Sequence, residues 1–323
     1  MKAVIIGGSG HFEYAVLSQC NECDIVAFAP ASVDEVLQRL ILCAGGKYKQ
    51  YDDYIQMLDE EQPDVAIINP HFYLIPTVLI ECLKRKIHCF VEKPLAFTLS
   101  ELEEIESLAA NAHIGMMMIH RYQAAFYGAY TAVRNGEIGA IRLISVRKSY
   151  KMDVKPSWMH VKQKFGGIIP WVGAHALDIV QWMDFGQAIN ISAYSIHGGN
   201  KGMGEIESVA SVHMVSENDC IANVTLDYLR PESLISHGDD SLMIAGDRGI
   251  IEVRNNTVSL VADNSDQEKE LPLQKQPQIF QDFIRSVRGE ATYRISFNDA
   301  CETARMYIAA EESALHNQKV RIK

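Results

Sequence analysis

The tripeptide Glu92-Lys93-Pro94 has the clearest chemical capacity in the sequence. It follows a short apolar run, residues 87–91, that is typical of a buried strand. Pro94 disfavours the helical conformation at Lys93, so we expect the lysine in an extended turn at the end of that strand. A partly desolvated lysine near other charges has a pKa closer to neutrality, where it can take a proton from a hydroxyl group. We therefore predict Lys93 as a general acid or base; the alternative is an ordinary surface lysine.

His175 lies in a second segment with chemical capacity, residues 166–178. Two glycines come first, and a helix that opens with Gly173 and His175 follows, a pattern that favours a loop delivering the imidazole into a cleft. Asp178 lies three residues further on, on the same helix face, where it can orient or charge the imidazole. The alternative is a histidine packed in the core. The chain lacks a two-histidine or Cys/His set at ligand spacing, and we predict no metal site.

A glycine-rich loop follows the first predicted strand, residues 3–6. Backbone N–H groups in such a loop can bind a pyrophosphate, and the start of the next helix adds its dipole. The match to GxGxxG is partial, because Gly8 and Gly10 supply two glycines and Glu13 stands at the third position. Proteins that bind S-adenosylmethionine or flavin use similar turns. On an alternating α/β segment, however, the loop predicts a site for a phosphate group. The residues expected to bind it are Gly7, Gly8, Ser9, Gly10, His11 and Phe12.

The second predicted strand, residues 24–28, ends without the acidic residue that usually binds the adenosine ribose. Ser32 can bond a ribose hydroxyl or a 2′-phosphate, but it also fits the N-cap of the next helix. Glu35 would then be its capping-box partner. No arginine stands at this strand end. The choice between NAD and NADP therefore stays open, with a slight lean away from strict NAD use.

The elements around these residues predict two domains. Short apolar runs alternate with helical patterns over the first 120 residues, which predicts an α/β Rossmann domain with a doubly wound parallel sheet. Its strands include residues 65–68, which end at Asn69-Pro70, and its last helix has Ser100 and Glu103 as a capping box. Residues 221–229 instead alternate apolar and polar side chains, which is typical of an antiparallel strand with one buried face. We predict a Rossmann domain over 1–121 and an α+β domain with a large, mainly antiparallel open sheet over 122–323.

Composition narrows the possible partners. The chain has 323 residues and a formal net charge of −11, which argues against nucleic-acid binding. Its seven cysteines show no disulfide spacing, and the lone pair Cys20 and Cys23 is better explained as structural than as a zinc or redox site. No apolar run approaches the ~18 residues that span a bilayer, and no leader opens the chain, so we predict no membrane partner and a cytoplasmic location.

In this order, these motifs resemble the Gfo/Idh/MocA oxidoreductases, the glucose–fructose oxidoreductase and inositol dehydrogenase group. The likeness covers nearly the whole chain. Its anchors are residues 3–10, Asn69-Pro70, Glu92-Lys93-Pro94, Arg121-Tyr122, residues 135–139 and residues 166–178. The resemblance implies a bound NAD or NADP, with Asn69, Pro70, Glu92 and Lys93 near the cofactor. It also implies Lys93 and His175 as catalytic residues, and a sugar, inositol or related polyol as substrate.

The sequence departs from the family pattern at two positions. The family usually has an aspartate four residues before the catalytic histidine, and this chain has Trp171 there. The family also usually has a histidine after the Asn-Pro turn, and the nearest candidate in this chain is His71. An indole cannot accept a proton, but it can stack on a sugar ring or on nicotinamide. The residues that we expect to line the substrate pocket are Tyr122, Trp158, His160, Trp171 and Asp178.

The leading hypothesis is an NAD(P)-dependent oxidoreductase that acts on a hydroxyl or carbonyl carbon of a sugar-like small molecule. Two alternatives remain open. One is a hydrolase or isomerase of the same fold that recycles its NAD, and the other is a catalytically silent dinucleotide-binding or regulatory protein. The resemblance also implies a homodimer or homotetramer that associates through the C-terminal sheet.

Overall fold

The computed structural model describes residues 1–263, 265 and 267–322, and the chain divides into two compact units. The first unit comprises residues 1–118, 163–165 and 277–301, and the second comprises residues 119–162, 166–276 and 302–323. Part of the C-terminal third of the chain thus completes the N-terminal unit. The division into domains 1–121 and 122–323 stays a prediction.

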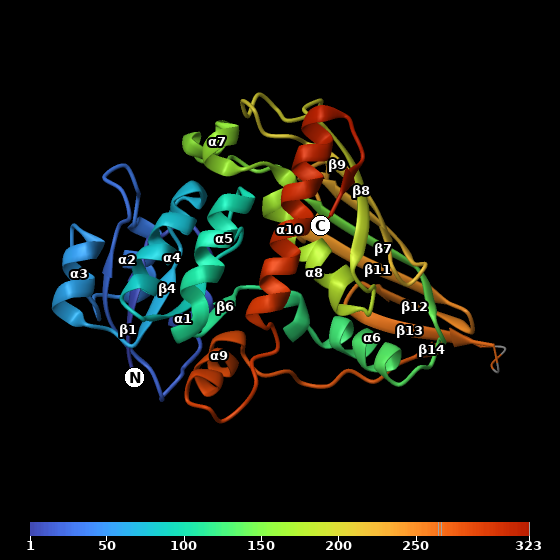
Figure 1. The fold of residues 1–323 in the computed structure, drawn as a ribbon, viewed down its shortest axis with the longest axis horizontal. Coiled ribbons are helices and arrows are strands. Elements are labelled where there is room, and N and C mark those ends of the chain that lie inside the picture. The colour runs from blue at the N-terminus through green and yellow to red at the C-terminus, as the bar shows by residue number, and fades with distance from the viewer. Residues whose placement is uncertain (264, 266, 323) are drawn as a thin grey trace. The chain divides into compact units, whose positions relative to one another are not determined.

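The first unit is built on a six-stranded sheet in which all paired strands are parallel (Figure 1). The strand order is β3-β2-β1-β4-β5-β6, so the order reverses between β1 and β4. The central strands are continuous runs of Ala, Val and Ile and are buried on both faces, as expected for a parallel sheet covered by helices. The strands are β1 (Lys2–Ile6), β2 (Asp24–Ala29), β3 (Lys49–Gln50), β4 (Val65–Ile68), β5 (His88–Val91) and β6 (Ile114–Met116).

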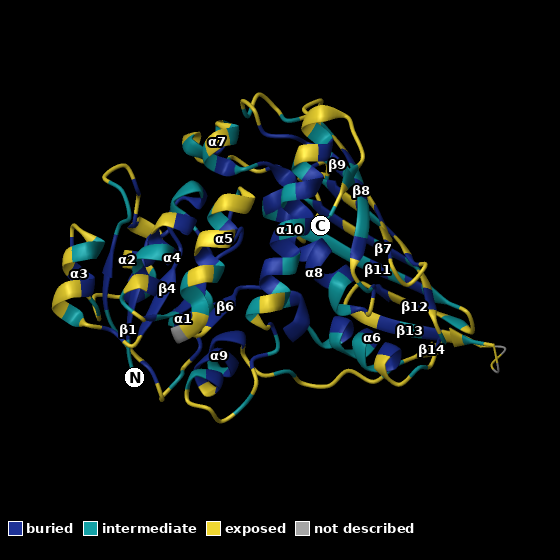
Figure 2. Ribbon diagram, viewed as in Figure 1, coloured by how far each residue is buried: buried dark blue, intermediate teal, exposed yellow. Residues whose placement is uncertain are grey.

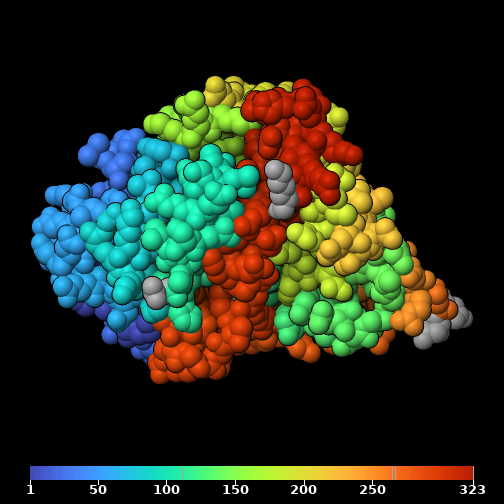
Figure 3. Space-filling view, viewed as in Figure 1, coloured from blue at the N-terminus to red at the C-terminus, as the bar shows by residue number. Residues whose placement is uncertain are grey.

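Helices pack on this sheet with their apolar sides inward and their polar sides exposed (Figure 2). They are α1 (Glu13–Val16), α2 (Gln38–Ala44), α3 (Tyr54–Glu61), α4 (Ile75–Lys84), α5 (Leu99–Leu108) and α9 (Ile279–Val287). Helix α9 contacts α1 and β5, and in the space-filling view the orange-red segment that includes it lies against the blue and teal surface of the same unit (Figure 3). Phe280 and Phe283 of α9 pack against Phe90 of β5, with ring centroids 5.2 and 5.4 Å away.

Two expected helix starts are wrong. Thr98 caps α5 and forms the capping box with Glu101, two residues before the Ser100–Glu103 pair that the sequence favoured. Helix α2 begins only at Gln38, so Ser32 does not cap it; the Ser32 hydroxyl donates to Asp34 instead, at 2.7 Å. In both places several residues fit the local capping pattern, and packing selects among them.

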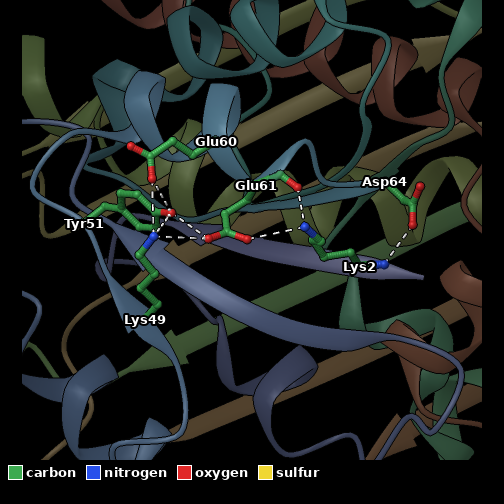
Figure 4. A network of polar contacts seen from close by, with 6 residues as sticks. All are labelled: Lys2, Lys49, Tyr51, Glu60, Glu61 and Asp64. Atoms are coloured by element: carbon green, nitrogen blue, oxygen red, sulfur yellow. Dashed lines mark hydrogen bonds and ion pairs between the residues drawn. The ribbon is translucent and has the colours of Figure 1, made fainter.

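A polar network ties α3 to strands β1 and β3 (Figure 4). The Tyr51 hydroxyl lies 2.6 Å from the Glu61 carboxylate and 3.0 Å from that of Glu60, and Lys49 lies 3.3 Å from the Glu60 carboxylate. The backbone N–H of Lys2 donates to Asp64 at 2.8 Å, and the Lys2 ammonium donates to the Glu61 carbonyl oxygen at 2.5 Å. Most of these side chains are partly exposed, so we assign the network a structural role.

The second unit contains a nine-stranded sheet in the order β14-β13-β12-β11-β7-β10-β9-β8-β15. Among the described strands of this second sheet, only β7 and β10 pair in parallel, and the other pairs are antiparallel. The strands are β7 (Ile141–Tyr150), β8 (Ala188–Ile196), β9 (Val209–Ser216), β10 (Ile221–Asp227), β11 (Gly238–Gly246), β12 (Gly249–Arg254), β13 (Thr257–Ala262), β14 (Lys269–Glu270) and β15 (Val320–Arg321). The segment 263–269 is polar, and its sequence favours an exposed loop; its residues 264 and 266 lie outside the described residues.

One face of this sheet is covered and the other is open. Helix α6 (Ala124–Arg134) contacts β12 and β13, and α8 (Ala174–Trp182) contacts β7 and β10 (Figure 1). The remaining α-helices in the described part of the chain are the short α7 (Lys162–Phe165) and the long α10 (Phe297–His316). The opposite face exposes the apolar side chains Tyr194, Ile196, Val215, Ile221, Ile250 and Val261.

Both halves of the predicted fold class are confirmed. The first unit has the parallel, doubly wound sheet, and the second has the large, mainly antiparallel sheet. Within the described part of the chain, no helix is long and apolar enough to cross a membrane.

Candidate functional site

The glycine loop joins β1 to the carboxyl edge of β4. Gly7 has a φ of +82°, and a Cβ at this position would lie 2.3 Å from the Cα of Pro70, so only glycine fits. Two backbone bonds fix the loop, from Gly7 N–H to the Ala29 carbonyl and from Ser9 N–H to the Asn69 carbonyl, both at 2.8 Å. The loop therefore lies where the strand order reverses, which is where open α/β sheets bind their ligands.

Asn69 leaves its side-chain amide without a partner. It is fully buried, and no hydrogen-bond partner among the described residues reaches its oxygen or its nitrogen. A Cβ on Gly10 would lie 2.4 Å from the Asn69 oxygen and 2.7 Å from Glu92 Oε2, so glycine at position 10 lets the loop backbone approach these polar groups closely. A buried amide without a partner is costly unless a ligand satisfies it. These residues therefore fit a polar ligand such as a dinucleotide.

Glu92 anchors the turn that carries Lys93. Its fully buried carboxylate accepts from the N–H of His11 at 2.8 Å and from that of Lys93 at 2.9 Å, and it lies 2.5 Å from Nδ1 of His11. Burial acts to raise the pKa of Glu92, but the positive charges of His11 and Lys93 outweigh it and hold this pKa below its usual range. Glu92 is thus a buried anion that joins the glycine loop to the end of β5.

Lys93 itself is almost completely buried, with 2% of its surface exposed. Its Nζ lies 6.0 Å from the centre of the Phe72 ring, and the Lys93–Pro94 peptide bond is cis. The helix after the glycine loop, α1, has only four residues, so its dipole contributes less than the sequence led us to expect.

In the second unit, His175 lies in the first turn of α8, directly after a π-helical turn over Ile169–Gly173. Short π-helical turns are rare and often occur at functional sites. Trp171 lies in this turn and is half-buried, whereas His175 is 8% exposed.

Asp178 and Arg121 form a buried ion pair beside His175. Arg121 Nε lies 3.1 Å from each Asp178 oxygen, and Nη2 lies 2.6 Å from one of them. This bidentate pair fastens α8 to the turn Ile119–Tyr122, which also contains Tyr122. The Arg121 partner of Asp178 was not predicted.

A cluster of ionisable side chains around Lys148 was also not predicted from the sequence. Lys148 Nζ is fully buried and lies 2.8 Å from His120 Nε2 and 2.7 Å from Asp240 Oδ2; His120 Nε2 and Asp240 Oδ2 are themselves 2.8 Å apart. Burial lowers the pKa of Lys148, and the Lys148 and His120 charges hold that of Asp240 well below its usual range despite its burial. The His120 ring is 4.9 Å from the His175 ring, so this cluster of ionisable groups adjoins the proposed catalytic histidine.

A second cluster lies under the loop that leads to His175. The Lys162 ammonium contacts Glu207 and lies 2.9 Å from Glu311, and a Cβ on Gly167 would lie 3.1 Å from an oxygen of each carboxylate. Burial, reinforced by the charge of Glu207 and opposed by Lys162, raises the pKa of Glu311 to about 7. The buried Glu207 and the partly buried Glu311 thus share one ammonium.

The remaining predicted pocket residues lie in different parts of the fold. Tyr122 is buried beside Arg121. Trp158 and His160 lie in the short turn Ser157–His160, where His160 Nε2 is 3.1 Å from the Lys155 carbonyl. No group of three or more metal-ligating side chains occurs within the ranges that the structure describes.

Two family models match the chain along most of its length. Residues 1–120 match the oxidoreductase family with an NAD-binding Rossmann fold, and residues 127–252 match the GFO/IDH/MocA C-terminal domain. The chain belongs to the Gfo/Idh/MocA family. The expected family and its NAD-binding Rossmann domain are thereby confirmed.

Similar proteins of this family differ in how closely they match. An oxidoreductase from Thermotoga maritima is 37% identical, with a TM-score of 0.96 and full coverage of both chains. An oxidoreductase from Agrobacterium radiobacter, solved with NAD+, L-tartaric acid and magnesium, shares the fold at 18% identity, with a TM-score of 0.82 and coverage of 100% and 98%. A myo-inositol 2-dehydrogenase of Thermotoga maritima is 24% identical over 162 residues, which cover 50% of this chain and 48% of that protein. The match therefore spans about half the length of this curated relative.

Proposed function

We propose that this Gfo/Idh/MocA protein is an NAD(P)-dependent dehydrogenase or reductase. Its substrate would be a sugar, an inositol or a related polyol, oxidised or reduced at a hydroxyl or carbonyl carbon. The unpartnered Asn69 amide, buried beside Gly10 and the Glu92 carboxylate at the switch point of the Rossmann sheet, carries the proposal for the cofactor. The inositol dehydrogenase relative supports the substrate class.

A bound nicotinamide would supply or accept the hydride at the reacting carbon. Lys93 would take the hydroxyl proton during oxidation and return it during reduction, so that the alcohol loses one hydride and one proton in total. Glu92 would hold the Lys93 backbone in place through the 2.9 Å bond that it already makes. Burial would keep bulk water away from the Lys93 side chain.

His175 would be the second acid–base residue, and Tyr122, Trp171 and Asp178 would belong to its surroundings. Asp178 would hold α8, the helix that carries His175, through the ion pair that its carboxylate makes with Arg121. Trp158 and His160 would line the substrate pocket. The open face of the nine-stranded sheet, with its exposed apolar side chains, supports a homodimer or homotetramer.

The test begins with the mass of any nucleotide that copurifies with the protein. A panel of sugars, inositols and polyols follows, read at the absorption band of reduced nicotinamide. We expect Lys93→Met to lose turnover by a factor of about 100 or more, because a positioned acid or base contributes about that much. Lys84→Met, at an exposed position near the end of α4, is the matched control.

Full turnover by Lys93→Met on the same substrate would contradict the assignment. Cofactor binding without turnover on any member of the panel would instead favour a catalytically silent dinucleotide-binding protein. That alternative draws its support from Trp171, which replaces the carboxylate expected four residues before His175.

A further inference from the structure

The end of β2 lacks the acidic residue that recognises the adenosine ribose in most NAD-binding Rossmann domains. The strand ends at Ala29 and runs on through Pro30 and Ala31. Ser32 is taken by its own local hydrogen bond to Asp34. Residues 29–32 therefore offer no carboxylate at the position expected to recognise the ribose.

In the structure, the Glu35 carboxylate lies beside the segment that follows β2. Its Oε1 accepts from Gly8 N–H and from the Ser9 hydroxyl, both at 3.1 Å, and its Oε2 accepts from Ala31 N–H at 2.9 Å. Only 8% of the residue surface is exposed. The carboxylate thus joins the glycine loop to the segment after β2, although it is six residues beyond the strand end in sequence.

The charges around this loop favour an unmodified ribose. Residues 30–37 contain two carboxylates, Asp34 and Glu35, and no lysine or arginine. Two cations in contact with the neighbouring segments are already paired: Arg39 Nε lies 2.9 Å from Glu13, and Lys164 Nζ lies 4.0 Å from Asp34. A 2′-phosphate at this place would meet a buried carboxylate, and like charges at short distance are strongly unfavourable.

We propose that Glu35 replaces the missing strand-end carboxylate, accepts hydrogen bonds from the adenosine ribose, and makes this chain selective for NAD over NADP. The proposal rests on the proposed function, since it presumes that the first unit binds a nicotinamide dinucleotide. The missing carboxylate at the strand end argues against strict NAD use, whereas the position of Glu35 leads to the opposite conclusion. Glu35 acts here as a specificity-determining residue and takes no part in hydride transfer.

Calorimetric titration of the full-length protein with NAD and with NADP tests this directly. We expect wild type to bind NAD about 10-fold or more tightly than NADP. Glu35→Gln keeps the side-chain size and removes the charge, so it should narrow this ratio by about the same factor. Asp34→Asn, which removes the neighbouring exposed carboxylate, is the matched control and should leave the ratio near the wild-type value.

The outcomes are distinguishable. Equal binding of both nucleotides by wild type overturns the inference, whatever the variant does. A Glu35→Gln protein that loses affinity for NAD and NADP by the same factor shows a structural role for Glu35 alone, and it also overturns the inference. If wild type binds neither nucleotide, the proposed function itself fails.

Discussion

We expect the variant Asp178→Asn to be much less stable than the wild type, because Asp178 forms a buried ion pair with Arg121. Only 3% and 1% of the two side chains are exposed, and their contacts are 2.6 to 3.1 Å long. Asparagine keeps the shape of the side chain but leaves the guanidinium buried without this counter-charge. Breaking a buried pair from one side costs about 3–5 kcal/mol. We expect the free energy of unfolding to fall by that amount.

Urea denaturation at a fixed protein concentration, followed by circular dichroism, measures the change. The matched control is Asp247→Asn, which breaks a bidentate pair with Arg142 whose side chains are 47% and 50% exposed. Solvent screens this pair, so we expect little change. Equal losses in the two variants would refute the reasoning, because burial is the main difference between the two pairs.

Three further predictions concern the glycine loop and the two ionisable clusters. Gly10→Ala should weaken NAD binding about 10-fold or more in calorimetry, because a Cβ would meet the polar groups around it, while Gly198→Ala, with open space around it, should bind normally. Glu311 has a pKa raised to about 7, so the folded chain keeps a proton that the unfolded chain releases between about pH 4.5 and 7. The unfolding free energy should fall with rising pH across that window, by at most about 3 kcal/mol, and Glu311→Gln should flatten the curve; parallel curves would contradict this. Lys148→Met should raise the pKa of Asp240 in an NMR titration, and an unchanged pKa would show that the ammonium does not hold it down.

Most of the fold could be predicted because its signals are local. The alternation over 221–229 follows from side-chain period alone, and the structure has a strand at Ile221–Asp227. Capping was less predictable. Ser100–Glu103 and Thr98–Glu101 both fit the same four-residue pattern, and the choice depends on which turn the chain packs against the sheet.

The residues of the candidate site also differ in how far the sequence reveals their positions. The glycine loop, Asn69 and Lys93 could be found because each follows a recognisable strand, and parallel strands bring their carboxyl ends to one edge. Glu35 was visible in the sequence but was paired with Ser32, its neighbour in sequence. Its actual partners on the glycine loop are 26 and 27 residues away, and no local pattern specifies them.

The cluster around Lys148 supplies ionisable groups near His175 in a chain that lacks the family's aspartate before this histidine. The family's aspartate would stand on the turn before α8, where this chain has Trp171. A carboxylate nevertheless occurs in the second unit 2.8 Å from His120 Nε2, on Asp240 of β11, where it pairs with the Lys148 ammonium from β7. The centres of the His120 and His175 rings are 4.9 Å apart, and His120 Nε2 lies 2.8 Å from both Lys148 and Asp240. The acid–base groups near His175 therefore come from the sheet as well as from its own helix. Replacement of the aspartate by Trp171 therefore does not leave this part of the second unit without ionisable partners.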